Sequence, residues 1–95
     1  MFIIDIKFKV DLETVNKYVM EHRQWLDTKY AAGLLLCSGP KEPRVGGIII
    51  ALGDEIDKIQ ELIQEDPYNQ HGVAEYTITE FLPNKYNQHL KSLFE

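Results

Sequence analysis

Residues 4–10 alternate strictly between apolar and charged side chains, with Phe2 continuing the apolar series, and no other feature of the chain constrains its fold as much. Apolar residues occupy positions 2, 4, 6, 8 and 10, whereas charged residues occupy positions 5, 7 and 9. A period of two is typical of a strand that buries one face. Asp11 follows as a helix N-cap, with Glu13 favourably placed in the first turn. The chain therefore opens with a strand that passes directly into a helix.

Helical spacing and breaking residues predict the next three elements. Apolar residues at positions 12, 15, 19 and 26 indicate one long helix that runs to about residue 32 and ends at Gly33. The apolar runs 34–37 and 48–52 are predicted strands. The intervening residues 38–47 are rich in glycine and proline, so we expect a loop that joins the two strands as a hairpin.

The C-terminal half contains a second helix, a fourth strand and a short last helix. The second helix begins after Gly53-Asp54 and ends at Asp66-Pro67, because the residue before a proline avoids helical backbone angles. Residues 73–82 form the fourth predicted strand, and Pro83 suits the first turn of the last helix. The order is β-α-β-β-α-β, which predicts an α+β ferredoxin-like domain with a four-stranded antiparallel sheet. Right-handed crossovers place both main helices on one face, and 95 residues make one domain, residues 1–95.

The other face of this sheet needs a cover. Residues 48–52 are apolar at every position, so both faces of that strand are expected to be buried. A monomer would expose the outer side as an apolar patch. We therefore expect a homodimer packed sheet to sheet across a two-fold axis. The alternative is that the C-terminal helix folds across the bare face of its own chain.

Charge and composition narrow the possible partners and location. The formal net charge is −5, with acidic and basic residues interspersed, which disfavours nucleic acid and anionic membranes as partners. No apolar stretch is long enough to span a bilayer, and the charge at Asp5 interrupts the only N-terminal candidate for a signal peptide. The single cysteine, Cys37, has no internal disulfide partner, which fits the reducing cytoplasm.

Two polar residues occupy apolar stripes of the predicted helices. His22 shares the stripe 15, 19, 22 and 26 of the first helix, and Asp66 shares the stripe 56, 59, 63 and 66 of the second. Because two helices on one face of a small sheet lie side by side, the imidazole and the carboxylate could meet in a cleft if the helices cross at the matching height. Such a pair is suited to proton transfer near neutral pH. The structural alternatives are a hydrogen-bonded core histidine and an aspartate that only starts the turn at Pro67.

The remaining polar candidates are weaker. His71, His89 and Cys37 lack metal-ligand spacing, so we expect no metal and no other cofactor. Ser38 is not surrounded by a nucleophile-elbow motif and is an ordinary turn residue. Lys41 and Arg44 either receive an anionic ligand or are solvated surface charges. Trp25 lies beside the inward stripe, where core packing is the simplest role.

Four short motifs in order along the chain resemble a known family, the YciI-like proteins or YCII-related domain family. They are Glu21-His22-Arg23 with Leu26, Gly33-Leu34-Leu35 with Ser38-Gly39-Pro40, Gly46-Gly47-Ile48-Ile49, and Glu65-Asp66-Pro67-Tyr68. The resemblance covers about residues 2–86. It implies a ferredoxin-like fold, a dimeric α/β barrel, and a histidine–aspartate active-site pair that corresponds to His22 and Asp66.

The resemblance also directs the functional hypothesis towards small ligands. One relative is a dehydrochlorinase of chlorinated aromatics, and similar dimeric barrels include muconolactone isomerases and small monooxygenases. We therefore predict a cofactor-independent enzyme that transfers protons on a small organic, often aromatic, substrate as a lyase, isomerase or dehalogenase. His22 is the predicted acid or base and Asp66 orients it. Predicted substrate contacts, including an oxyanion-holding loop, are Ser38, Gly39, Pro40, Arg44 and Tyr68.

Two other functional classes fit the same sequence. In the first, the chain is a non-catalytic ligand-binding or accessory module whose His22–Asp66 pair only joins two helices. In the second, it is a protein-interaction domain that uses the outer edges of the dimer. A pair that lines an open pocket favours the enzyme, whereas a pair sealed in the core favours the binding module.

Overall fold

The computed structural model describes all residues from 1 to 95 and contains one four-stranded antiparallel sheet in the order β2-β3-β1-β4. The strands are β1 (Phe2–Phe8), β2 (Leu35–Pro40), β3 (Gly46–Ala51) and β4 (Ala74–Glu80). The helices are α1 (Leu12–Asn16), α2 (Val19–Ala31), α3 (Ile56–Gln64), α4 (Pro67–Gln70) and α5 (Lys91–Phe94), with a 3-10 turn η1 (Gln88–Leu90) before α5. The predicted ferredoxin-like α+β architecture is confirmed.

The alternation at the N-terminus becomes the central strand. On β1, Phe2, Ile4 and Ile6 are almost fully buried, and the residues between them point to the opposite face. Ile4 pairs with Ile49 of β3 on one side and with Ile78 of β4 on the other, so these side chains share the face beneath the helices. The register is fixed because a slip of one residue would expose this whole apolar set.

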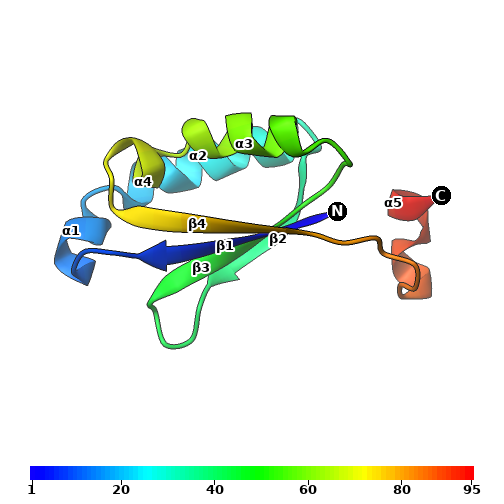
Figure 1. Cartoon of the computed structure of the whole chain (residues 1–95), viewed down its shortest axis with the longest axis horizontal. Helices are drawn as coiled ribbons and strands as arrows, with labels where there is room; N and C mark the ends of the chain where they lie inside the picture. The colour runs from blue at the N-terminus through cyan, green and yellow to red at the C-terminus, as the bar shows by residue number, and fades with distance from the viewer.

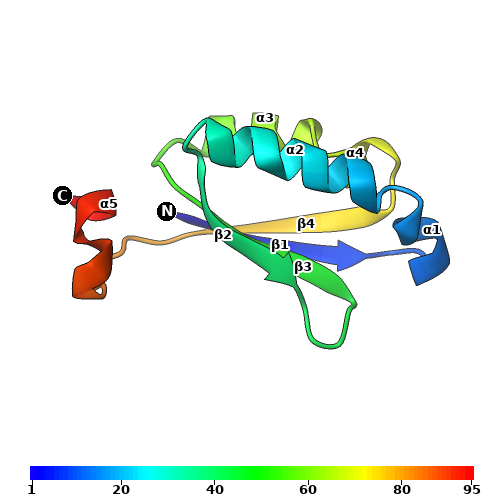
Figure 2. The ribbon, with the colours of Figure 1, turned by 180° about the vertical axis from the view of Figure 1, so that it is seen from behind.

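Helices α2, α3 and α4 all cover the same face of the sheet (Figures 1 and 2). Helix α3 contributes Ile59, Leu62 and Ile63 to the core, while Ile56 of the predicted stripe remains partly exposed. Helix α2 contributes Trp25, which is 7% exposed. The predicted stripe also faces inward, since Val15 is fully buried and Val19 and Leu26 pack half-buried against the core. Trp25, one position before Leu26, is the residue of α2 that is buried in the core itself.

Several predicted element boundaries are wrong. The single helix over residues 12–32 is two helices, because the chain turns at Lys17 and Tyr18. This turn allows Val15 to be fully buried while the Tyr18 ring stacks on His71 at a centroid distance of 3.8 Å. Residues 38–40 are not in a loop but continue β2, since they pair with β3, and the last helix begins at 88 rather than at 83.

Gly46 shows why the hairpin is so closely packed against β1. A Cβ atom at this position would collide with the backbone carbonyl of Ile6, so any larger residue forces the strands apart. Gly33, which was predicted to end the helix, has φ of 75° immediately after α2.

The face opposite the helices is not covered by the chain itself. Helix α5 lies beyond the end of the sheet, at the end of an extended segment (Figure 1), so the C-terminal helix does not fold across the bare face. That face carries half-buried Ile3, Ile48 and Ile50, with an ion pair between Lys41 Nζ and Asp5 Oδ1 at 2.6 Å.

None of the helices has the length and apolar character that a membrane crossing requires.

Candidate functional site

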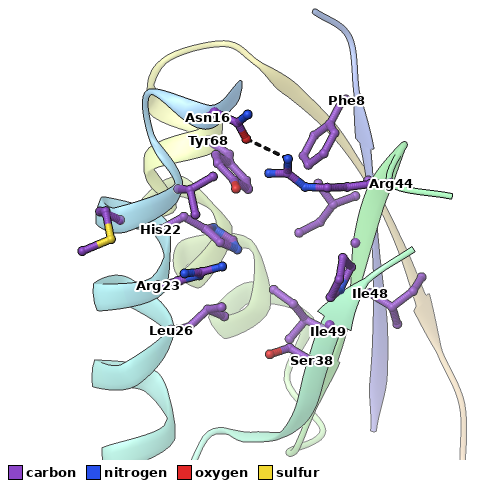
Figure 3. Close-up of a pocket in the computed structure, with 17 residues that line it drawn as sticks. Phe8, Asn16, His22, Arg23, Leu26, Ser38, Arg44, Ile48, Ile49 and Tyr68 are labelled. Atoms are coloured by element: carbon purple, nitrogen blue, oxygen red, sulfur yellow. Dashed lines mark hydrogen bonds between the residues drawn. The ribbon is translucent and has the colours of Figure 1, made fainter. Parts of the chain in front are cut away.

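A cleft of about 750 Å³ lies between α2 and the β2–β3 hairpin. Figure 3 shows α2 on one side of it and the strands of the hairpin on the other. The cleft is lined by residues from α1, α2, the two hairpin strands and the turn between them, the end of β1, and α4. The polar residues and glycines among them are Asn16, His22, Arg23, Ser38, Gly39, Arg44, Gly46, Gly47 and Tyr68; the apolar ones include Phe8, Val19, Leu26, Pro40 and Ile49.

His22 and Asp66 are in direct contact behind this cleft. The Nδ1 atom of His22 lies 2.8 Å from Oδ1 of Asp66, although the residues are 44 positions apart in sequence. The side chain of His22 is 12% exposed, whereas that of Asp66 is completely buried. An ionised carboxylate can only accept, so it selects the imidazole tautomer with the proton on Nδ1.

Asp66 holds its position through two further hydrogen bonds. The backbone N–H of Tyr68 donates to Oδ1 at 3.0 Å, and the hydroxyl of Tyr76 donates to Oδ2 at 2.6 Å. Asp66 is the N-cap of α4 and not, as the stripe predicted, the last turn of α3, which ends at Gln64. At this N-cap position the carboxylate accepts the N–H of Tyr68, a hydrogen bond that favours the ionised form.

Burial, together with the adjacent Asp66 charge, raises the pKa of Tyr76 far above its ordinary value. Tyr76 therefore remains a neutral hydrogen-bond donor to the carboxylate. With three donors fixed around it, the buried carboxylate is a rigid support for one specific orientation of the His22 ring.

The imidazole of His22 is also fixed by stacking. Its ring lies on that of Tyr68 with centroids 3.9 Å apart and planes inclined by 10°. Nε2 has no hydrogen-bond partner in the chain, and His22 borders the cleft. With Nδ1 bound to the carboxylate, the neutral ring presents the free lone pair of Nε2, which can accept a proton from a bound molecule.

Positive charge gathers on the walls of the same cleft. Arg44, from the turn between β2 and β3, donates through Nη1 to Oδ1 of Asn16 at 2.7 Å, and its guanidinium lies 5.9 Å from the centre of the Phe8 ring. Arg23 lies next to His22 on α2 (Figure 3). Burial raises the pKa of the Tyr68 phenol, although the nearby charges of Arg44 and Arg23 act in the opposite direction.

The predicted Ser38-Gly39-Pro40 contact segment lines the cleft, but as a strand. Its backbone pairs with β3, and Pro40 has no N–H, so the segment does not form the expected loop of free amides. The hydroxyl of Ser38 lies 2.7 Å from that of Tyr30 and is the polar group that this segment offers. Any oxyanion contact from β2 would therefore involve Ser38 Oγ rather than a cluster of backbone N–H groups.

The structure brings most of the predicted residues together and adds some that the sequence reasoning missed. His22, Ser38, Gly39, Pro40, Arg44 and Tyr68 all line the cleft, whereas Asp66 lies behind His22. Arg23, Asn16 and Tyr76 were not predicted as site residues. Arg23 was present in the Glu21-His22-Arg23 motif, but nothing in the sequence placed the hydroxyl of Tyr76 against Asp66, because that contact depends on how β4 packs beneath α4.

The other candidates lie elsewhere. His71 stacks on Tyr18, and the Nζ of Lys41 contacts Asp5 on the far face of the sheet. Trp25 is buried, and its Nε1 has no acceptor. No three His, Cys, Asp or Glu side chains are grouped as a metal site would require.

The fold is similar to that of a solved enzyme. The structure of 5-chloro-2-hydroxyhydroquinone dehydrochlorinase (TftG) from Burkholderia phenoliruptrix AC1100, in complex with 2,5-dihydroxybenzoquinone, superposes with a TM-score of 0.76 at 17% sequence identity. The alignment covers 93% of this chain and 96% of the dehydrochlorinase. At this identity the similarity establishes the fold. No curated protein matches the sequence. The model of the YCII-related domain matches residues 1–82, and the chain belongs to the YCII-related domain family.

Proposed function

We propose that this protein is an enzyme that transfers protons on a small organic substrate without a cofactor. The observation that carries the proposal is the state of His22: Nδ1 is held by the buried Asp66, the ring is stacked on Tyr68, and Nε2 is left free at the edge of a cleft. A fixed base with one available nitrogen is what proton abstraction requires. The reaction class is that of a lyase, isomerase or dehalogenase.

In the proposed chemistry, His22 first accepts a proton from the substrate and, in an isomerisation, then returns it. Nε2 takes a proton from an acidic C–H or O–H group of the substrate, and the resulting imidazolium is stabilised by the carboxylate of Asp66. The electron pair left on the substrate either moves to an adjacent oxygen or expels a leaving group. Return of the proton to another atom completes an isomerisation, and departure of the leaving group completes an elimination. In this proposal Ser38 Oγ, which lies at the cleft wall and 2.7 Å from the Tyr30 hydroxyl, donates to the oxygen that gains charge.

The similar solved enzyme supports this class of substrate. It is named for a chlorinated hydroxyhydroquinone, and its structure holds 2,5-dihydroxybenzoquinone. Both molecules are small, flat and rich in oxygen. The cleft of this chain is about 750 Å³ and combines apolar walls with a few polar groups, a combination suited to a molecule of that kind. Fold similarity supports the reaction class and does not select the substrate.

Solvent deuterium exchange tests the proposal without knowledge of the net reaction. Hydroxylated aromatic compounds and quinones are incubated with the protein in heavy water, and loss of carbon-bound proton signals is followed by NMR. We expect the protein to accelerate exchange of at least one compound, His22→Gln to abolish the acceleration, and Asp66→Asn to reduce it by about 100-fold or more. His89→Gln, which changes an exposed histidine outside the cleft, is the control. Equal exchange by the wild type and His22→Gln across the set would refute the proposal.

Ligand binding without turnover is the alternative, and one observation favours it. His22 is only 12% exposed, and the pair also connects α2 with α4, as a purely structural hydrogen bond would. In that case no compound exchanges its protons, yet ligands still bind in the cleft. Exchange that depends on His22 excludes this alternative.

We also propose that two copies of the chain pack through the open face of the sheet. Ile3, Ile48 and Ile50 lie together across β1 and β3 on the face that no helix covers, and α5 is too far away to protect them. A second copy supplies the same apolar surface. Sedimentation equilibrium should show a dimer that Ile48→Asp dissociates, whereas Leu82→Asp, at an exposed site in the C-terminal segment, should not. A wild-type monomer would contradict this assembly.

A further inference from the structure

The chain has only two arginines, Arg23 and Arg44, and both line the same cleft. They come from different elements, α2 and the turn between β2 and β3, and are 21 positions apart. Figure 3 shows them approaching the space beside His22 from opposite walls. The fold has therefore gathered its arginines at the one place where the proposed chemistry occurs.

Neither arginine is neutralised by the protein. The ion pairs that lysines form with carboxylates involve Lys29 with Glu65, Lys41 with Asp5, and Lys58 with Glu55; no arginine forms one. The chain has 15 acidic residues, yet none of the residues that line the cleft is an aspartate or a glutamate. Carboxylates are abundant on this protein and are absent from the one surface that both arginines share.

The guanidinium of Arg44 has unused hydrogen-bonding capacity. It can donate five N–H bonds, and its side-chain acceptor in the protein is the neutral amide oxygen of Asn16. The Phe8 ring and the Asn16 amide hold the planar group at the cleft wall without cancelling its charge. Such a group matches the two oxygens of a carboxylate, or two adjacent ring oxygens of a deprotonated phenol or hydroxyquinone.

The hydroxyl of Tyr68 is close enough to both arginines for their charges to affect its pKa. Burial raises the pKa of the Tyr68 phenol, and the positive charges of Arg44 and Arg23 oppose that increase. Arg23, Arg44 and Tyr68 all line the cleft, and the Tyr68 ring stacks on that of His22, so both positive charges lie in the cleft that His22 borders.

We propose that the substrate is a small planar organic oxyanion whose charged oxygens bind Arg44 and Arg23, while its reacting carbon lies at Nε2 of His22. This inference rests on the proposed function for the role of His22, but the selection of an anion rests on the arginines alone. The arginines also assist the reaction, because negative charge that develops on the substrate oxygens during proton abstraction is stabilised where they bind.

Two matched pairs of compounds test the charge selection. Benzoate and benzamide differ in charge at a carboxyl-sized group; 2,5-dihydroxybenzoquinone is anionic at neutral pH, whereas 2,5-dimethoxybenzoquinone is neutral. Binding is measured by NMR titration of the arginine Nε–Hε and backbone resonances at low ionic strength. We expect at least one anion to bind about tenfold or more tightly than its neutral counterpart. A preference in the benzoate pair indicates a carboxylate substrate, and a preference in the quinone pair indicates a ring oxyanion.

Variants assign this preference to the arginines. Arg44→Gln and Arg23→Gln should each weaken binding of the anion by about tenfold and leave the neutral compound unaffected. Arg44→Lys, which retains the charge but loses the planar donor set, should lie in between. Lys85→Gln removes the same charge from an exposed site outside the cleft and should change nothing. Because Arg23 is exposed on α2, its variant tests the inference even if a change at Arg44 disturbs the hairpin.

The outcome separates this inference from the proposed function. In His22→Gln the preference for the anion should persist although proton exchange is lost. If neither anion is preferred over its neutral partner, or if the preference survives when both arginines are replaced by glutamine, the inference is wrong. Proton exchange that depends on His22 would still support the proposed function in that case.

Discussion

Replacing Asp66 by alanine should destabilise the fold by about 3–5 kcal/mol, the cost expected when one partner of a buried charged hydrogen bond is removed. Three groups lose their acceptor: the backbone N–H of Tyr68, the hydroxyl of Tyr76 and Nδ1 of His22. Each buried polar group left unpaired costs about 1–3 kcal/mol. His22 is 12% exposed and can turn towards water, so the larger share comes from Tyr68 and Tyr76.

Urea unfolding followed by far-UV circular dichroism measures this cost, at one fixed protein concentration so that any dimerisation contributes equally. Asp66→Asn, which keeps an acceptor oxygen, should lose less than Asp66→Ala. Asp27→Ala, at an exposed position of α2, should change the free energy of unfolding by no more than about 0.5 kcal/mol. If Asp66→Ala costs less than about 1 kcal/mol, the three hydrogen bonds do not organise the site, and the reasoning about a rigidly oriented His22 is refuted.

Three further predictions concern the tyrosine, the hairpin and the core. Because the pKa of Tyr76 is raised in the folded state, its contribution to stability is complete below about pH 10. Above that pH the unfolded chain loses the proton first, and the free energy of unfolding falls by about 1.4 kcal/mol per pH unit. In urea unfolding at a series of alkaline pH values, the free energy of unfolding should therefore fall less steeply with pH for Tyr76→Phe than for the wild type. Equal slopes for the two proteins would contradict the burial of the Tyr76 phenol. Gly46→Ala should destabilise the protein by more than about 1 kcal/mol because its Cβ collides with the Ile6 carbonyl; a neutral effect in thermal unfolding would show that the strands separate easily. Ile59→Ala should cost about 2–5 kcal/mol and Ile56→Ala clearly less, since the first side chain is 4% exposed and the second 39%, and equal losses in urea unfolding would argue against this placement of α3.

Local patterns were sufficient to predict the type and order of the main elements. The alternation of residues 2–10 predicted β1, because side chains on a strand alternate between faces whatever the strand packs against. Gly33 marked the end of α2 for an equally local reason, its positive φ angle. The two polar residues in apolar stripes, His22 and Asp66, were identified in the same way, since a polar group at an inward position needs a partner.

The boundaries of the helices and strands, and the surroundings of the site residues, depended on tertiary contacts that no local sequence pattern indicates. The helix predicted over residues 12–32 breaks at Tyr18, whose ring stacks on His71 more than fifty positions later. Residues 38–40 form a strand although they read as a loop, because an edge strand gains its hydrogen bonds from the neighbouring β3. Asp66 caps α4 instead of ending α3, and its carboxylate therefore accepts the N–H of Tyr68.

Patterns in the sequence were enough to predict the secondary-structure order, the ferredoxin-like class and the two residues whose polarity conflicts with their positions. Those properties follow from spacing along the chain, which is 3.6 residues per turn in a helix and two in a strand. The tertiary structure alone decided that His22 meets Asp66 at 2.8 Å, that Tyr76 completes the carboxylate's hydrogen bonds, and that both arginines share one cleft. The crossing of helices over a sheet brings distant residues within a few ångströms, and hydrogen bonds and charges act over that spatial distance rather than over separation in sequence.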